Sequence, residues 1–220
     1  TDSVHRQLSH ELYGFKRIMM APIAPEEVET DYIVCTHAHA DHLDIDLVAV
    51  LADDGRVTFV GAPDCEAGFM AQGIPAERRI TMTLGQPLMC GDVRLLPVAA
   101  DHGDLAPDAL GLVLEAEGIR VWQVGDSAYR PDMWQDVFAL GIDVLIPPIN
   151  GAFGNLNPIE AARLAGDCRA RIAIPCHFWM FAEHGGDPAA FLGECRIYAP
   201  ETQACLMSQG EMLMVESVPR

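Results

Sequence analysis

Short apolar runs of strand length alternate with helical stretches along most of the chain, from Asp31 onward. An apolar run of roughly four to eight residues between turn residues is typical of a buried strand, whereas apolar positions recurring every three or four residues are typical of a helix. The pattern predicts strands over residues 32–35, 57–60, 144–147 and 172–175, and helices over residues 44–51, 65–72, 131–140 and 188–197. We therefore expect a layered α/β domain with its site on loops at one sheet edge.

Turn residues add two hairpins and one helix start. The hairpins join residues 87–90 to 93–99 and residues 111–116 to 119–124, with glycine at each turn. The run Asn157-Pro158-Ile159-Glu160 offers an N-cap, a proline at the first helical position and a glutamate three residues after the cap, so we expect a helix to begin there. No internal repeat or linker divides the chain, and we expect one domain over residues 1–220.

The most distinctive polar segment follows the first predicted strand directly and reads Thr36-His37-Ala38-His39-Ala40-Asp41-His42. On a loop at a strand end, His37 and His39 can direct two imidazoles toward one point, while Asp41 and His42 can turn toward a neighbouring point. A lone histidine is more often structural, but three histidines and an aspartate in so short a run indicate metal binding. We therefore expect two divalent cations.

Imidazole and carboxylate ligands suit zinc or manganese, with iron as a third candidate. A cation in a partly open site lowers the pKa of its bound water enough to give hydroxide near neutral pH. The sequence therefore predicts a metal-dependent hydrolase, in which neither a cysteine nor a serine is needed as the nucleophile.

The histidine run matches in full the H-x-H-x-D-H signature of the metallo-β-lactamase superfamily, which the chain resembles. The resemblance implies the metallo-β-lactamase fold, a four-layer αββα sandwich. It also implies three further ligands: a histidine after a hairpin strand, an aspartate in a Gly-Asp turn and a late histidine after another strand. Candidates occur in this order as His102, Asp126 and His177.

The resemblance also divides the ligands between two sites. The first site would comprise three histidines, namely His37, His39 and His102. The second would comprise Asp41, His42 and His177, with Asp126 bridging the two metals.

Within the superfamily, residues 125–129 (Gly-Asp-Ser-Ala-Tyr) and 174–179 (Ile-Pro-Cys-His-Phe-Trp) look like those of the L-ascorbate-6-phosphate lactonase group. Superfamily domains begin with a pair of strands before the position of Thr1, so the resemblance implies an N-terminally incomplete domain. It further implies a cyclic ester as the substrate.

The leading hypothesis is hydrolysis of a small, sugar-derived lactone, with or without a phosphate, by a two-metal-activated hydroxide. Asp41 would orient this hydroxide and accept its proton, and Tyr129, three residues after Asp126, would donate to the substrate. The alternative is a phosphodiesterase acting on a small phosphodiester or cyclic nucleotide, because two metals can also stabilise an in-line displacement. A non-catalytic metal-binding protein is disfavoured, since every ligand position is filled.

The composition of the chain excludes some classes of binding partner. Lysine and arginine total 14 against 32 acidic residues, and the net charge of -18 repels nucleic acid and anionic membranes. Only Arg130 is basic and close to the ligands in sequence, so we expect a small-molecule substrate and no polynucleotide. No apolar run approaches the roughly 18 residues of a membrane span. A homo-oligomer is compatible with the sequence.

The cysteines and one further histidine complete the candidates. Seven scattered cysteines without a C-x-x-C pair are typical of reduced thiols in a cytoplasmic protein. Cys35 and Cys176 fall inside apolar runs, so we expect small buried residues rather than ligands. His184 lies in a Gly-rich turn, where we expect a solvated histidine.

Overall fold

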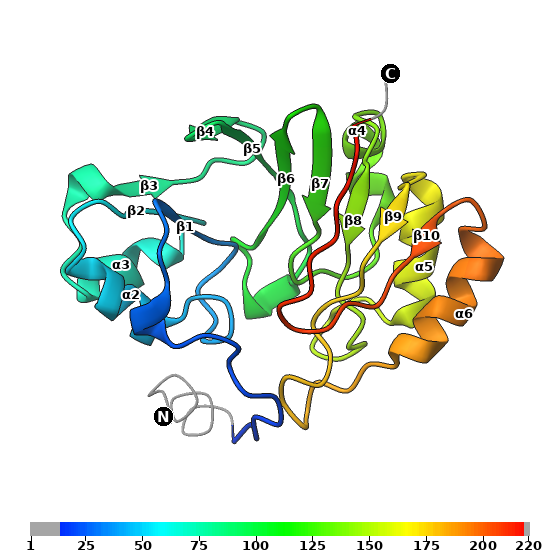
Figure 1. Cartoon of the computed structure of the whole chain (residues 1–220), viewed down its shortest axis with the longest axis horizontal. Helices are drawn as coiled ribbons and strands as arrows, with labels where there is room; N and C mark the ends of the chain where they lie inside the picture. Colours follow the sequence, from blue (N-terminus) through cyan, green and yellow to red (C-terminus); the bar gives the residue numbers. More distant parts are fainter. Residues whose placement is uncertain (1–13, 218–220) are drawn as a thin grey trace. The chain divides into compact units, whose positions relative to one another are not determined.

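The computed structural model describes residues 14–217. They form two compact units (Figure 1). The first unit comprises residues 14–83 together with Phe181–Glu183, and the second comprises Leu84–Met180 and the chain from His184 onward.

The first unit is built around a three-stranded parallel sheet of order β1-β2-β3. Each strand is connected to the next through a helix, as parallel pairing requires. Its elements in chain order are η1 (Pro25–Glu27), β1 (Tyr32–Cys35), α2 (Ile45–Ala52), β2 (Thr58–Gly61), α3 (Cys65–Ala71), η2 (Ala76–Arg78) and β3 (Arg79–Thr81).

Local chemistry defines both ends of α2. The Asp44 side chain accepts hydrogen bonds from the backbone of Asp46 and Leu47, which caps the first turn. At the other end, the Arg78 guanidinium donates to the carbonyl oxygens of Leu51 and Ala52 at 3.1 and 2.8 Å. The last carbonyls of a helix lack the N–H groups of a following turn, so the guanidinium, together with the Asp54 N–H that donates to the Leu51 oxygen at 3.2 Å, satisfies them.

The second unit contains a seven-stranded sheet of order β10-β9-β8-β7-β6-β5-β4. The strands from β4 to β7 pair antiparallel, and those from β7 to β10 pair parallel. Its elements are β4 (Leu88–Cys90), β5 (Val93–Ala99), η3 (Gly103–Leu105), β6 (Leu110–Ala116), β7 (Ile119–Gln123), η4 (Pro131–Met133), α4 (Gln135–Phe138), β8 (Val144–Ile146), α5 (Pro158–Asp167), β9 (Ile172–Ala173), α6 (Pro188–Tyr198) and β10 (Gln203–Ala204).

This topology brings four strand ends to one edge. Since β5 and β7 are both antiparallel to β6, they run in the same direction, and β8 and β9 are parallel to β7. The carboxyl ends of these strands therefore meet at the same edge of the seven-stranded sheet. The segments that follow them carry the later ligand candidates of the sequence.

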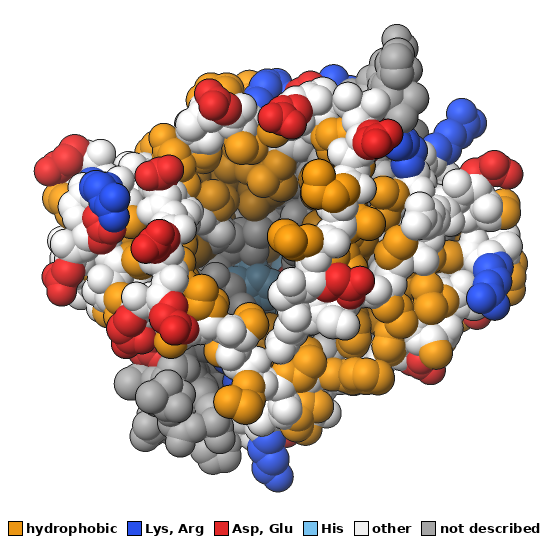
Figure 2. Space-filling model, viewed as in Figure 1, with side chains coloured by type: hydrophobic (Ala, Val, Ile, Leu, Met, Phe, Trp, Pro, Cys, Tyr) orange, Lys and Arg blue, Asp and Glu red, His pale blue; other side chains and the backbone are white. Residues whose placement is uncertain are grey.

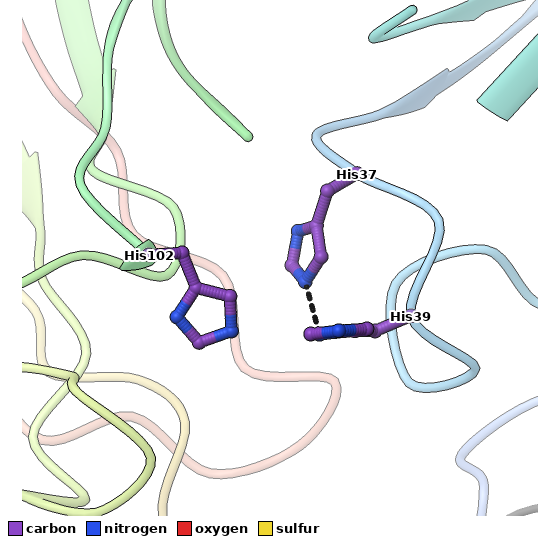
Figure 3. A group of neighbouring side chains, drawn as sticks. All are labelled: His37, His39 and His102. Carbon is purple, nitrogen blue, oxygen red and sulfur yellow. Dashed lines mark hydrogen bonds between the residues drawn. The ribbon is translucent and has the colours of Figure 1, made fainter. Parts of the chain in front are cut away.

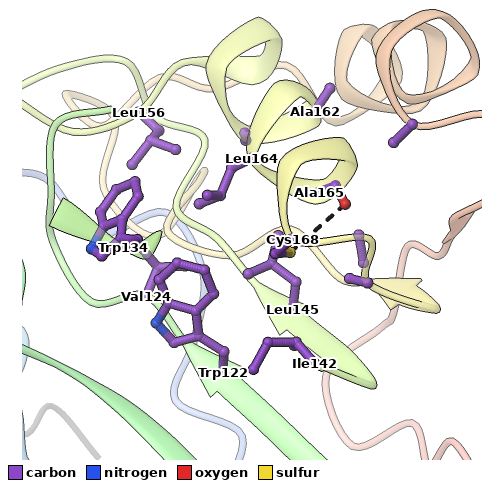
Figure 4. Close-up of a cluster of buried hydrophobic side chains, with 14 of the residues drawn as sticks. Trp122, Val124, Trp134, Ile142, Leu145, Leu156, Ala162, Leu164, Ala165 and Cys168 are labelled. Carbon is purple, nitrogen blue, oxygen red and sulfur yellow. Dashed lines mark hydrogen bonds between the residues drawn. The ribbon is translucent and has the colours of Figure 1, made fainter. Parts of the chain in front are cut away.

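A buried apolar cluster fixes the helices of the second unit against its sheet (Figure 4). Trp122 on β7 and Trp134 after η4 meet edge to face, with ring centroids 5.4 Å apart, and both are fully buried. Leu145 on β8 and Leu164 on α5 belong to the same cluster. Because this core consists of side chains alone, its packing does not depend on a bound metal.

The expected α/β class is confirmed, and most predicted elements occur within one or two residues of their expected bounds. The helix expected over residues 131–140 is wrong: η4 and the short α4 replace it, with Trp134 between them. Trp134 has the non-helical backbone angles φ -111° and ψ 11°, and its buried indole donates to the Ala99 carbonyl oxygen at 2.8 Å, a tertiary contact that local periodicity does not include. The short strands β3 and β10 were not predicted.

The surface agrees with the acidic composition. Acidic side chains are distributed over much of the visible face, and basic side chains are less common there (Figure 2). Among residues 14–217, no helix has both the length and the apolar character needed to cross a membrane.

Candidate functional site

Three imidazoles crowd together in the loop after β1, all within the first unit. The His37 Nε2 and His39 Nδ1 atoms are 2.9 Å apart, with the two rings edge to face (Figure 3). The His42 ring lies against the other side of this group, with its centroid 4.0 Å from that of His37. The Thr36 hydroxyl is 3.1 Å from His37 Nδ1 and 3.3 Å from His42 Nδ1. The loop thus gathers three of the predicted ligands without help from the second unit.

Asp64, at the N-cap of α3, holds the backbone of this loop. Its Oδ2 atom accepts the Ala38 N–H at 3.0 Å, between the two leading histidines. Asp41 lies in the turn that follows, with its Oδ2 atom 3.7 Å from His42 Nε2. Sequence reasoning missed Asp64 because 26 positions separate it from Ala38 and no motif connects them.

In the second unit, Asp126 lies between two of the predicted histidine ligands. Its Oδ2 atom is 3.7 Å from His102 Nε2, and its Oδ1 atom is 3.3 Å from His177 Nε2. The Asp126 and His102 residues are buried, and the His177 side chain is only 9% exposed. The two oxygens of one carboxylate therefore face different histidines, which is the arrangement a bridging carboxylate needs.

The turn that presents Asp126 requires glycine before it. Gly125 has φ +75°, and a Cβ there would lie 2.7 Å from the Leu110 carbonyl oxygen. Glycine alone tolerates both the left-handed conformation and this close approach. On the other side, the Ser127 hydroxyl accepts the Asp101 N–H at 2.8 Å, which connects the turn to the segment of His102.

Asn155, which sequence reasoning also missed, orients the Asp126 carboxylate. Its Nδ2 atom donates to Asp126 Oδ2 at 2.8 Å, and both residues are buried. Asn155 comes from the segment after β8, so a fourth strand end contributes to the same cluster, besides those of β5, β7 and β9. The only sequence signal for it is a polar residue two positions before the helix cap Asn157.

Comparison with known proteins identifies the family of the chain. The family described as a beta-lactamase superfamily domain matches residues 9–178, which is most of the chain. A UPF0173 metal-dependent hydrolase of Aeropyrum pernix is 31% identical over 87% of this chain and 84% of its own length. The chain belongs to the metallo-β-lactamase superfamily. Within the superfamily, it belongs to the UPF0173 metal-dependent hydrolases.

Solved structures of the superfamily share the fold. Igni18, a metallo hydrolase of Ignicoccus hospitalis, has a TM-score of 0.70 at 20% identity, over 87% of this chain and 82% of its own. YhfI of Bacillus subtilis, a metallo-β-lactamase fold protein, has a TM-score of 0.63 at 18% identity, over 82% of this chain and 76% of its own. The expected superfamily is confirmed by the family match, and the expected fold by these structures, whereas the role of each ligand stays a prediction.

Tyr129 and Arg130, which the sequence analysis singled out for their closeness to Asp126 in sequence, are engaged by other side chains. The Tyr129 hydroxyl donates to Asp167, the last residue of α5. Burial, together with this hydrogen bond, raises the pKa of Tyr129 above its usual range. Arg130 pairs with Asp101 and Asp132. Both side chains therefore already bond to aspartates of the protein.

Three residues that were not expected to bind metal, namely Cys35, Cys176 and His184, can be compared by their burial. Cys35 is buried, as expected, and burial raises the pKa of the half-buried Cys176 to about 12, so this thiol stays neutral at ordinary pH. His184 is only 2% exposed, and the expectation of a solvated histidine there is wrong. Its ring is stacked on that of His177, an arrangement that only the tertiary structure reveals.

Proposed function

We propose that this metal-dependent hydrolase binds two divalent cations, zinc or manganese with iron as a third candidate, and acts on a small, sugar-derived lactone. The observation that carries the proposal is the position of Asp126, whose two carboxylate oxygens lie near two different histidines, His102 and His177. A carboxylate that serves only one cation has no need of a second histidine at its other oxygen.

The donors suit such cations. Imidazole and carboxylate ligands bind zinc, manganese and iron, and no thiol or thioether is included. The residues proposed to hold the cations are His37, His39, Asp41, His42, His102, Asp126 and His177. Their assignment as ligands is supported by the H-x-H-x-D-H signature and by membership of the superfamily. When bound, the cations supply a water activated near neutral pH and polarise the substrate carbonyl.

Three residues of the chain would orient a ligand or move a proton: Asn155, Asp41 and Tyr129. Asn155 holds the Asp126 carboxylate in a single orientation through its 2.8 Å hydrogen bond. We assign proton acceptance to Asp41, whose carboxylate is only partly buried. Donation by Tyr129 to the substrate remains part of the proposal, and it requires the hydroxyl to exchange its present hydrogen bond to Asp167.

Charge supports a small substrate over a polyanion. The chain carries a net charge of -18, and Arg130, the basic residue nearest to Asp126 in sequence, is already paired with two aspartates. A polynucleotide would need several uncommitted cations along its path. A phosphodiesterase acting on a small phosphodiester is the alternative, because the same pair of cations suits both reactions. All seven cysteines are free thiols, which supports a cytoplasmic location.

The test is a steady-state comparison of aldonolactones, their phosphates, acyl-homoserine lactones and cyclic nucleotides. Metal-stripped protein and Asp126→Ala serve as negative controls, and Asp136→Ala, which changes an exposed aspartate on α4, is the matched control. We expect turnover of a lactone by the native protein and by Asp136→Ala, with a loss of more than about 100-fold in Asp126→Ala. Turnover of a phosphodiester without any lactone turnover would replace the leading proposal by the alternative.

A further inference from the structure

His177 and His184 lie on two short stretches of the second unit, residues 177–180 and 184–186, which are hydrogen-bonded to each other. The Trp179 N–H donates to the Gly185 carbonyl oxygen at 3.3 Å, and its indole donates to the Gly186 carbonyl oxygen at 3.0 Å. A Cβ on Gly186 would lie 2.6 Å from the Phe178 Cβ, so only glycine fits this close approach. The two stretches are therefore held side by side.

Backbone strain is concentrated in the first of these stretches. His177 and Trp179 have φ +58° and +59°, although neither is a glycine. A bulky residue in the left-handed region is an outlier that the surrounding structure has to stabilise, and such outliers gather at functional sites. The consequence of this conformation is the placement of His177 against His184.

The two imidazoles are buried together. Their rings are nearly parallel at 14°, with centroids 4.5 Å apart, and the His184 residue is only 2% exposed. Each ring offers a nitrogen within 4.8 Å of a nitrogen of the other. Phe153 packs edge-on against His184 with a centroid distance of 6.1 Å. His177 Nε2 in turn lies 3.3 Å from Asp126 Oδ1.

This separation suits two ligands of one cation. Two nitrogen ligands at roughly 2.1 Å from a zinc ion are at most about 4.2 Å apart, and because each lone pair lies in the plane of its ring, one ring has to rotate out of the stack for both nitrogens to reach one ion. If His184 served packing alone, a phenylalanine would fill the same place without the cost of burying a polar ring. The polar ring is explained if its nitrogen binds metal.

We propose that His184 is an additional metal ligand, which acts with His177 and Asp126 on the second cation. The H-x-H-x-D-H signature does not assign this role, and the inference rests on the proposed two-cation function. A further imidazole ligand would leave fewer positions on that cation for water or substrate.

The test separates metal binding from packing. His184→Phe keeps a ring that can stack on His177 and removes both ring nitrogens, whereas Phe153→Leu disturbs the same packing and leaves every nitrogen in place. His184→Gln is measured in parallel, so that a folding defect of the phenylalanine variant does not hide the result. Zinc content is measured by elemental analysis, the affinity for each equivalent by chelator competition, and the fold by circular dichroism.

We expect both His184 variants to bind the second equivalent about 10- to 100-fold more weakly than the native protein, while Phe153→Leu binds it normally. Two equivalents bound at native affinity by a folded His184 variant would show that the histidine only packs. Fewer than two equivalents in the native protein would overturn the two-cation proposal itself. Two equivalents without lactone turnover would refute the substrate proposal and leave the ligand assignment standing.

Discussion

At the scale of single residues, the candidate ligands depend on neighbours that are not ligands. Asp126 is oriented by Asn155, and the backbone between His37 and His39 is held by Asp64. Partners of this kind set the direction of a ligand, and their removal commonly weakens metal binding by about 10- to 100-fold. Each of the two can be tested against a residue of the same type whose side chain makes hydrogen bonds elsewhere in the fold.

Asn155→Ala removes the donor to Asp126 Oδ2 and leaves that oxygen without this partner in a buried position. We expect zinc affinity to fall by about 10- to 100-fold and stability to fall by about 1 to 3 kcal/mol. The matched control is Asn157→Ala, which removes the N-cap of α5 and costs about 1 kcal/mol without touching Asp126. Chelator competition and urea unfolding measure the two effects. Equal metal affinities in the two variants would contradict an orienting role for Asn155.

Asp64→Ala removes the acceptor of the Ala38 N–H. We expect faster hydrogen exchange at the Ala38 amide and zinc binding weakened by about 10-fold, because the loop no longer holds its two histidines in one geometry. Asp54→Ala is the control, since Asp54 likewise accepts a backbone N–H, that of Arg56 at 3.1 Å, on an exposed turn. Exchange measured by mass spectrometry that shows no change at Ala38 would contradict the assignment.

At the scale of elements, the contact between α5 and α6 depends on one glycine. A Cβ on Gly166 of α5 would collide with the Tyr198 carbonyl oxygen at the end of α6, whereas a Cβ on Gly193 of α6 would meet nothing within 4 Å. Both glycines lie inside helices, where alanine is intrinsically the better residue by about 1 kcal/mol. Only the tertiary contact distinguishes them.

We therefore expect the same substitution to have opposite effects at these two positions. Gly166→Ala should destabilise the protein by about 1 to 3 kcal/mol, because backbone atoms cannot move aside without separating the helices. Gly193→Ala should stabilise it by up to about 1 kcal/mol. Thermal and urea unfolding of the two variants provide the comparison. A stabilised Gly166→Ala would mean that the two helices are not in this contact.

At the scale of the whole molecule, burial keeps the thiols neutral. It raises the pKa of Cys168 and Cys176 to about 12 and that of Cys195 to about 11. A group whose pKa is higher in the folded state retains its proton while the unfolded chain loses it. These thiols therefore contribute most to stability below their ordinary pKa, near 9, and the contribution is lost as pH rises toward 11 to 12.

The prediction is that iodoacetamide at pH 8 modifies the half-buried Cys205 well before Cys168, Cys176 or Cys195, and that hydrolase activity survives. The unfolding free energy should decrease more steeply above pH 9 in the native protein than in a Cys168→Ala variant. Mass spectrometry of labelled peptides, with urea-unfolded protein as the fully labelled reference, tests the reactivities. Rapid loss of activity on alkylation of Cys176 would contradict a catalytic mechanism without thiols.

Much of the architecture was readable from the sequence. Strand β1 has its predicted bounds, and α5 begins at the capping box of Asn157 and Glu160 as expected, because the signals for both are local. The histidine run and the Gly125-Asp126 turn were also local, since their residue types and spacing alone carry the chemistry. The helix break at Trp134 escaped prediction because the contacts of this residue are long-range, among them the hydrogen bond of its indole to Ala99, 35 positions away.

By itself the sequence determined the family and most of the elements, and it predicted the ligands, because the signals for each lie in neighbouring residues. What only the tertiary structure decided was which residues surround those ligands. Asp64 reaches Ala38 across 26 positions, Asn155 reaches Asp126 across 29, and His184 stacks on His177 beside a strained stretch of backbone. Such pairings depend on where strand ends meet and which loop stretches pair, and periodicity along the chain carries no record of either.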